Sequence, residues 1–246
     1  MIRLMQVLTW LRPSRSVPVT RWRSDSRWSA RPATFGMLIL GLSLFGIGDG
    51  LLVVSGLGVS PWTVLAQGLS VRLPLTIGAA TFLVSSLVLL LWIPLRERPG
   101  LGTISNIIVI ASTLQATVWL VPKAGGTQPY LSPVSYLYVI AAITLIGLGS
   151  GLYLTCNLGP GPRDGWMTGI HQRTGWPVAR IRLGIEVVVL SIGWLLGGTI
   201  GVGTLAFALF IGPSVGYGLR FAGRIGRVPG RPMTQVADPA FPELDA

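Results

Sequence analysis

The sequence predicts an all-α membrane protein with six transmembrane helices in two inverted three-helix repeats, each with a short re-entrant or interfacial helix. Half of the 246 residues are hydrophobic and only 11% are charged, whereas about 25% of the residues of a typical soluble domain are charged. Six apolar segments reach the roughly 20 residues that are needed to cross a hydrocarbon core. A long stretch of the sequence also occurs twice, which indicates a duplicated unit.

The duplication relates two stretches that lie 101 positions apart. From Gly46 to Ser112, 16 of 67 positions carry the same residue as the position 101 residues later, whereas composition alone would give about a tenth. The shared residues include an LG-x-x-P motif and a later G-x-GT motif in one unbroken register. A register that holds over this length is typical of an internal repeat.

The predicted spans follow the apolar runs along the chain. They cover approximately residues 36–55, 75–94, 101–121, 135–156, 177–197 and 201–220. Two further segments begin at Pro61 and Pro162 and are too short to cross, because twelve helical residues cover only about 18 Å. Proline fits the first turn of a helix, where its missing N–H costs nothing, and Ser60 is a suitable N-cap.

The distribution of basic residues predicts the orientation. Each repeat contains three spans, so the second copy must enter the membrane the opposite way round from the first. Cytoplasmic loops collect Arg and Lys, and with the N-terminus inside, 17 of the 19 basic residues fall on the inner side. We therefore expect a multi-pass protein of the bacterial plasma (inner) membrane with both termini in the cytoplasm. Its transmembrane domain covers residues 35–223, with repeats at about 36–121 and 135–220.

The two ends of the chain have a different composition from the apolar domain. Residues 1–34 contain seven arginines among scattered Trp, Pro and Ser, which predicts a basic cytosolic arm that is disordered or lies at the membrane interface. Residues 224–246 are rich in Pro and lack an apolar period, so we expect a disordered cytosolic tail.

One candidate site residue is an acid within a predicted span. Glu186 lies about nine residues into span five, roughly 14 Å from its cytosolic end and near the bilayer midplane. An ionised acid there costs about 2.5 to 3.5 kcal/mol, so it must find a partner, face water or stay protonated. Arg182 lies one turn earlier on the same face. A structural ion pair and a role in binding protons or substrate both fit this pattern.

The other candidates lie at the starts of the two short helices. Arg163 and Asp164 occupy the first turn of the second short helix, where Arg163 could meet an anion and Asp164 suits the positive helix end. A simple helix cap held by Asp164 is the alternative. The full candidate solute site comprises Arg163, Asp164, Gly161, Gly165, Arg182, Glu186, Pro61 and Asp49.

The composition argues against several classes of function. One cysteine and one histidine are too few for the usual zinc or iron–sulfur ligand sets, so we expect no metal and no cofactor. The sequence contains no set of residues typical of an active site, so we expect no catalytic residues and no enzyme. The formal net charge is +11, and the basic residues lie between the apolar runs. In such positions they indicate the orientation of the protein in the membrane rather than a nucleic-acid partner.

Several motifs resemble a known family. These are GPRDGWM from Gly161, RTG from Arg173, GVGT from Gly201 and IGP from Ile211, together with an earlier LG-x-x-PW. Over residues 35–223 the chain resembles the YczE/YyaS/YitT-like family of bacterial multi-pass membrane proteins. The resemblance implies an integral plasma-membrane protein, and the N-terminal arm is longer than the family leads us to expect.

These observations favour a transporter or permease of a small polar or anionic solute. Inverted repeats with short, Gly- or Pro-interrupted segments at matching positions indicate a central transport site. The alternative is a non-transporting membrane scaffold or accessory protein that supports a cytosolic or biosynthetic partner. The lipid bilayer is the one partner that the sequence predicts directly, and the oligomeric state stays open.

Overall fold

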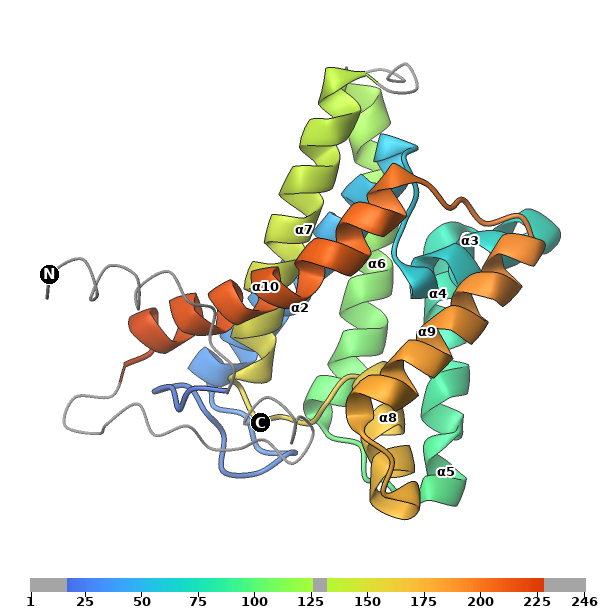
Figure 1. The fold of residues 1–246 in the computed structure, drawn as a ribbon. Coiled ribbons are helices and arrows are strands. Elements are labelled where there is room, and N and C mark those ends of the chain that lie inside the picture. The colour runs from blue at the N-terminus through green and yellow to red at the C-terminus, as the bar shows by residue number, and fades with distance from the viewer. Residues whose placement is uncertain (1–16, 126–131, 228–246) are drawn as a thin grey trace, which may run out of the picture.

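The computed structural model describes residues 17–125 and 132–227, and each regular element within these two ranges is a helix (Figure 1). The first part of the predicted arm and nearly all of the predicted tail lie outside the described residues. The helices are α2 (Pro32–Ser55), α3 (Pro61–Arg72), α4 (Ile77–Leu90), α5 (Trp92–Leu95), α6 (Leu101–Gly125), α7 (Pro133–Leu154), α8 (Pro162–Thr174), α9 (Val178–Leu195) and α10 (Val202–Ile225).

Five stretches of helix are long and apolar enough to cross a membrane. They are α2, α4 continued by α5, α6 as far as Pro122, α7 and α10. The sixth predicted span forms α9, which has 18 residues. Because three of them are charged, namely Arg180, Arg182 and Glu186, α9 is not one of the five candidate spans. The fold is therefore all-helical in the described ranges, with five candidate spans whose apolar faces contact lipid.

The two short helices begin at Pro61 and Pro162, as the sequence predicts. Pro61 and Pro162 occupy the first turns of α3, with 12 residues, and α8, with 13. The predicted cap Ser60 occupies the N-cap position of α3, but its side chain accepts no backbone N–H. Its hydroxyl lies instead 2.8 Å from the hydroxyl of Thr63 and 3.4 Å from Asp49 Oδ1.

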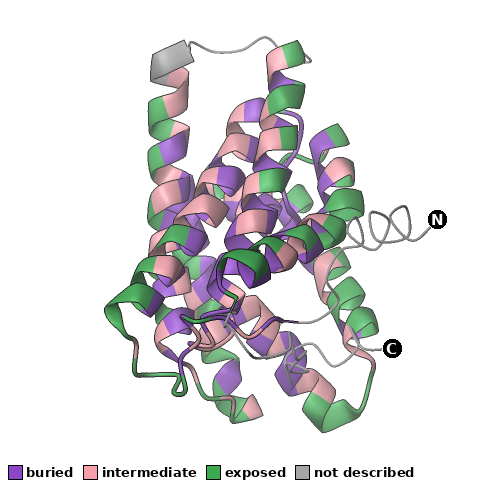
Figure 2. Ribbon diagram, turned by 90° about the vertical axis from the view of Figure 1, so that its left-hand side faces the viewer, coloured by how far each residue is buried: buried purple, intermediate pink, exposed green. Residues whose placement is uncertain are grey.

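The helices form two groups, one of α2, α6, α7 and α10 and the other of α3, α4, α5, α8 and α9 (Figure 1). Glycines let the first group pack closely, as expected when helices associate in lipid. A Cβ added to Gly41 would come within 2.8 Å of the carbonyl oxygen of Gly149. Figure 2 shows buried residues on the inward faces and exposed residues on the outward faces of these helices.

Two backbone hydrogen bonds join the matched stretches of the sequence. Gly102 N–H donates to the carbonyl oxygen of Leu158 at 2.8 Å, and Gly203 N–H donates to that of Leu57 at 2.7 Å. Gly203 and Leu158 lie 101 residues after Gly102 and Leu57. In each bond the donor and the acceptor therefore come from different stretches, and the two bonds have equivalent partners.

Residues 17–31 of the predicted arm pack against the ends of several helices. Trp22 is 4% exposed, and its Nε1 donates to Thr155 Oγ1 at 3.0 Å. Backbone hydrogen bonds join Ser24 to Cys156 at 3.0 Å and Leu101 to Arg27 at 2.9 Å. This part of the arm thus covers the C-terminal end of α7 and the start of α6, a contact that no sequence pattern indicated.

Candidate functional site

A cavity of about 130 Å³ lies between the two helix groups. It is large enough for several water molecules or a small solute, since one water occupies about 30 Å³ of the liquid. Seven helices contribute to its walls, namely α2, α3, α6, α7, α8, α9 and α10. Its lining is mainly apolar, with side chains such as Phe45, Ile146, Phe207 and Ile211.

The N-termini of both short helices reach this cavity. Ser60, Pro61 and Trp62 contribute the start of α3, and Gly161 and Pro162 contribute the start of α8. The first backbone N–H groups of a helix lack partners within the helix, and the helix dipole makes this end positive. The cavity therefore has two of the features that bind anions in proteins.

Arg163 adds a full positive charge at the start of α8. Its guanidinium carbon lies 5.1 Å from the ring centroid of Trp62 on α3, which is within the range of a cation–π interaction. Trp62 also meets Trp166 edge to face, with ring centroids 6.4 Å apart. These aromatic contacts hold the cation beside the cavity that it lines.

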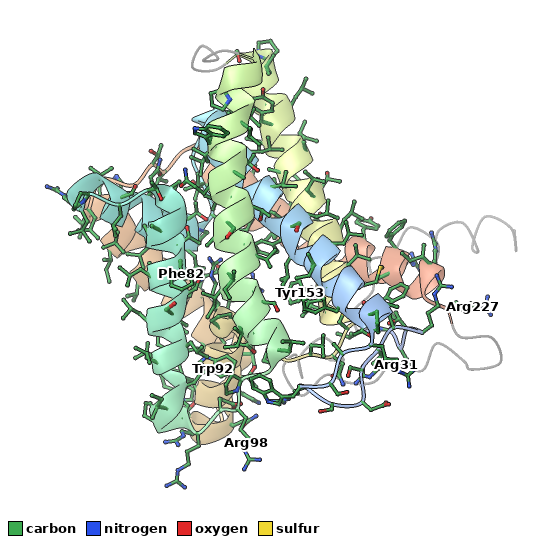
Figure 3. The ribbon with its side chains drawn as sticks, turned by 180° about the vertical axis from the view of Figure 1, so that it is seen from behind. Arg31, Phe82, Trp92, Arg98, Tyr153 and Arg227 are labelled. Atoms are coloured by element: carbon green, nitrogen blue, oxygen red, sulfur yellow. The ribbon has the colours of Figure 1, made fainter. Side chains whose placement is uncertain are left out.

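Asp164 connects α8 to α7. The hydroxyl of Tyr153 donates to Asp164 Oδ2 at 3.2 Å, and both residues line the cavity. Tyr153 lies near the middle of the molecule in Figure 3. The N-cap position of α8 belongs to Gly161, while Asp164 lies in the first turn.

Arg182 and Glu186 form an ion pair on α9. Arg182 Nε donates to Glu186 Oε1 at 2.9 Å, as their four-residue spacing allows. Both line the cavity, with side chains 48% and 28% exposed. The pair thus lies at an open edge of the cavity rather than in a closed interior.

Asp49 lies behind this lining. It is 1% exposed and its Oδ1 is 3.4 Å from the Ser60 hydroxyl. Among the residues that the structure describes, no group hydrogen-bonds to its Oδ2. The charge of Arg163 lies within electrostatic range of this carboxyl group. Asp49 and Arg163 thus both lie beside the first turn of α3, Asp49 at Ser60 and Arg163 at Trp62.

Comparison of the sequence with those of known proteins identifies a family. The sequence profile of a family of unknown function, DUF6198, matches residues 33–219. The chain belongs to this family. Its resemblance to YczE and YyaS, indicated by the motifs above, is confirmed.

Relatives of this DUF6198 protein come from two bacteria. An uncharacterized protein from Haemophilus influenzae is 44% identical over 220 residues, which cover 87% of this chain and 96% of that protein. The uncharacterized membrane protein YczE of Bacillus subtilis is 30% identical over 76% of this chain and 82% of its own length. The uncharacterized protein YyaS of the same organism is 26% identical over 68% of this chain and 82% of its own. No solved structure matches the chain.

In this DUF6198 protein, most of the predicted site residues come together. Six of them line the cavity, namely Pro61, Gly161, Arg163, Asp164, Arg182 and Glu186. Asp49 contacts the lining residue Ser60 from behind. Gly165 does not line the cavity, because it packs directly against the ring of Trp92, whose Nε1 donates to the Pro162 carbonyl at 2.8 Å.

The structure adds three residues to the predicted site. Trp62 and Tyr153 contact the charged side chains of α8, and Asn106 of α6 lines the cavity. The sequence favours an interhelical hydrogen bond over a ligand role for Asn106, a polar residue in an apolar run. Trp62 lies next to Pro61, whereas Tyr153 lies in a long apolar run that gave no signal. Within the described ranges, no cluster of three or more His, Cys, Asp or Glu side chains could hold a metal ion.

Proposed function

We propose that this protein is a plasma-membrane transporter that carries a small polar or anionic solute through the cavity between its two helix groups. The observation that carries the proposal is the position of Arg163, a cation beside two helix N-termini in a mainly apolar cavity. A guanidinium group and free helix N–H groups both favour an anionic group on the solute. The apolar lining favours a hydrocarbon part next to it.

The proposal includes an inverted repeat with both termini in the cytoplasm. It is supported by the paired hydrogen bonds from Gly102 to Leu158 and from Gly203 to Leu57, because equivalent contacts are expected across a pseudo-two-fold axis. In this arrangement α9 is the sixth span, and its charged pair lies at the open edge of the cavity. Transporters with such repeats expose a central site alternately to the two sides of the membrane.

Uptake into proteoliposomes tests the proposal. The full-length chain is reconstituted and screened with radiolabelled small carboxylates, phosphates and sulfonates. For the solute that is taken up, Arg163→Gln should reduce uptake about tenfold or more, because a hydrogen bond to a charged group contributes about 1.5 to 3 kcal/mol. Arg173→Gln is the matched control, since it removes an exposed arginine from the last turn of the same helix.

The result also distinguishes the alternative of a scaffold. The transporter proposal is wrong if no carboxylate, phosphate or sulfonate enters the vesicles. It is also wrong in its choice of site if a solute enters and Arg163→Gln leaves the uptake rate unchanged. A non-transporting protein that supports a cytosolic partner would then be the better explanation.

A further inference from the structure

The groups around the cavity do not balance in charge. Arg163 and Arg182 are two bases, whereas Asp49, Asp164 and Glu186 are three acids. Arg182 is paired with Glu186 and Asp164 accepts a hydrogen bond from Tyr153. Asp49 is therefore the acid whose charge is least compensated by hydrogen bonds, because its Oδ2 has no partner within the described residues.

We propose that Asp49 is a proton-binding site and that protonation of this carboxyl group frees Arg163 to bind the anionic group of the solute. The inference rests on the proposed function. It makes the protein a proton-coupled transporter in which one proton and one negative charge occupy the site together.

The surroundings of Asp49 favour a proton over a metal cation. The oxygens beside its carboxyl group come from the hydroxyls of Ser60 and Thr63, which are fewer than a metal ion of the Ca²⁺ type requires. The nearby guanidinium of Arg163 would repel a metal cation in this poorly solvated region. A proton has no such requirement, because it neutralises the carboxylate by forming an O–H bond at Oδ2.

Among the residues that the structure describes, Arg163 is the one charged group within electrostatic range of Asp49. Next to its neighbours Gly48 and Gly50, α7 presents Ala142 and Ile146, while α6 presents Leu114 and Thr117. None of these side chains titrates. The α3 helix contributes the Ser60 and Thr63 hydroxyls, and α8 contributes Arg163. Arg163 is in turn influenced by Asp164, Tyr153 and Glu186.

The total charge of the cluster links the binding of a proton to the binding of an anion. When Asp49 is ionised, it provides a counter-charge for Arg163, and an added anion would raise the negative charge of the cluster. When Asp49 has bound a proton, a monovalent anion restores the original total charge. Each ligand therefore favours the binding of the other, as linkage between two sites requires.

Infrared difference spectroscopy tests the proton site without any solute. The full-length protein in phosphatidylcholine vesicles is titrated with acid, and the carbonyl signal of protonated carboxyl groups is recorded. We expect one signal to be lost in Asp49→Asn and retained in the control Asp25→Asn, which changes an exposed acid outside the cavity. In Arg163→Gln the Asp49 signal should be present over the whole pH range, because a buried acid without its counter-charge stays neutral.

A binding experiment tests the coupling with benzenesulfonate, an anion with an apolar ring that stays ionised and carries no proton itself. Calorimetry in buffers of different ionisation enthalpy should give uptake of about one proton per bound anion in the wild type. Asp49→Asn should bind the anion with no proton uptake and no pH dependence.

The two proposals fail in different ways. An infrared titration that is unchanged by Asp49→Asn would overturn the proton site, even in a protein that transports a solute. Wild-type anion binding without proton uptake would do the same. If the Asp49 signal titrates as expected but no solute enters vesicles, the proton site stands and the transport function is wrong. The wild-type protein must itself show the signal of a protonated carboxyl group on titration. A wild type without this signal overturns the inference, whether or not the variants fold.

Discussion

Gly203 donates its backbone N–H to the carbonyl oxygen of Leu57 at 2.7 Å, and this approach leaves no room for a side chain at Gly203. A Cβ there would lie 2.6 Å from the carbonyl oxygen of Gly58. The equivalent Gly102 is also restricted, with a Cβ position 2.9 Å from the Leu158 carbonyl oxygen. The two matched stretches thus meet at two places where only glycine fits without a shift of the backbone.

We predict that Gly203→Ala and Gly102→Ala each destabilise the protein. The expected loss is about 1 to 3 kcal/mol, as for other overpacked contacts, and thermal unfolding in detergent would measure it. Gly212→Ala is the control within the same helix as Gly203, because no atom lies within 4 Å of its added Cβ. That change should be neutral or slightly stabilising, since Ala favours a helix over Gly by up to about 1 kcal/mol. Equal stability of Gly203→Ala and Gly212→Ala would contradict the prediction.

A second prediction concerns the packed part of the N-terminal arm. Trp22→Ala should destabilise the protein by about 3 to 5 kcal/mol, the usual cost of removing a buried tryptophan, because its indole is buried and bonded to Thr155. Trp28→Ala is the matched control, since that ring is 61% exposed and its loss should change the melting temperature little. The prediction is wrong if both substitutions have the same effect.

The ion pair on α9 gives a third prediction. Glu186→Gln should leave the melting temperature close to that of the wild type, because the half-exposed Arg182 side chain can extend its charged end to water. Solute uptake should nevertheless fall, since the change alters a group that lines the cavity. A double variant, Arg182→Gln with Glu186→Gln, tests whether the pair acts together. Wild-type uptake by Glu186→Gln would remove this residue from the site.

Cysteine labelling tests the inverted orientation. Cys156 is fully buried, and burial raises the pKa of its thiol to about 12, so almost no reactive thiolate exists at neutral pH. An impermeant maleimide should therefore not label the native wild-type protein. Leu73→Cys and Thr174→Cys place new thiols at exposed, equivalent positions in the two stretches. We expect Leu73→Cys to be labelled from outside and Thr174→Cys from inside, and labelling of both from one side would exclude inverted repeats.

Apolar length and proline position were sufficient to predict most of the helices. The six predicted segments correspond to α2, α4 with α5, α6, α7, α9 and α10, and Pro61 and Pro162 begin the short helices. These features are local, so a single sequence contains them. The inverted arrangement stays a prediction.

The contacts that sequence reasoning missed join distant segments. In the site, Trp62 meets Arg163, which lies 101 residues later, and in the arm Trp22 meets Thr155, which lies 133 residues later. No periodicity within these segments indicates that they meet. Gly165 belongs to the predicted site, but its missing side chain makes room for Trp92 instead. The first turn of α8 was thus identified correctly, whereas the direction in which each of its residues points depends on packing.

The contact between Trp62 and Arg163 has a consequence for how such a protein could arise. Arg163 lies 101 residues after Trp62, so the two hold matching positions in the two similar stretches, and they touch. In an ancestral pair of identical short chains related by the same symmetry, this position would bring a residue against a copy of itself. Two tryptophans could stack there, but two arginines would repel each other. A cation–π contact at this point therefore needs two stretches that differ in sequence at this position, as Trp62 and Arg163 do in this chain.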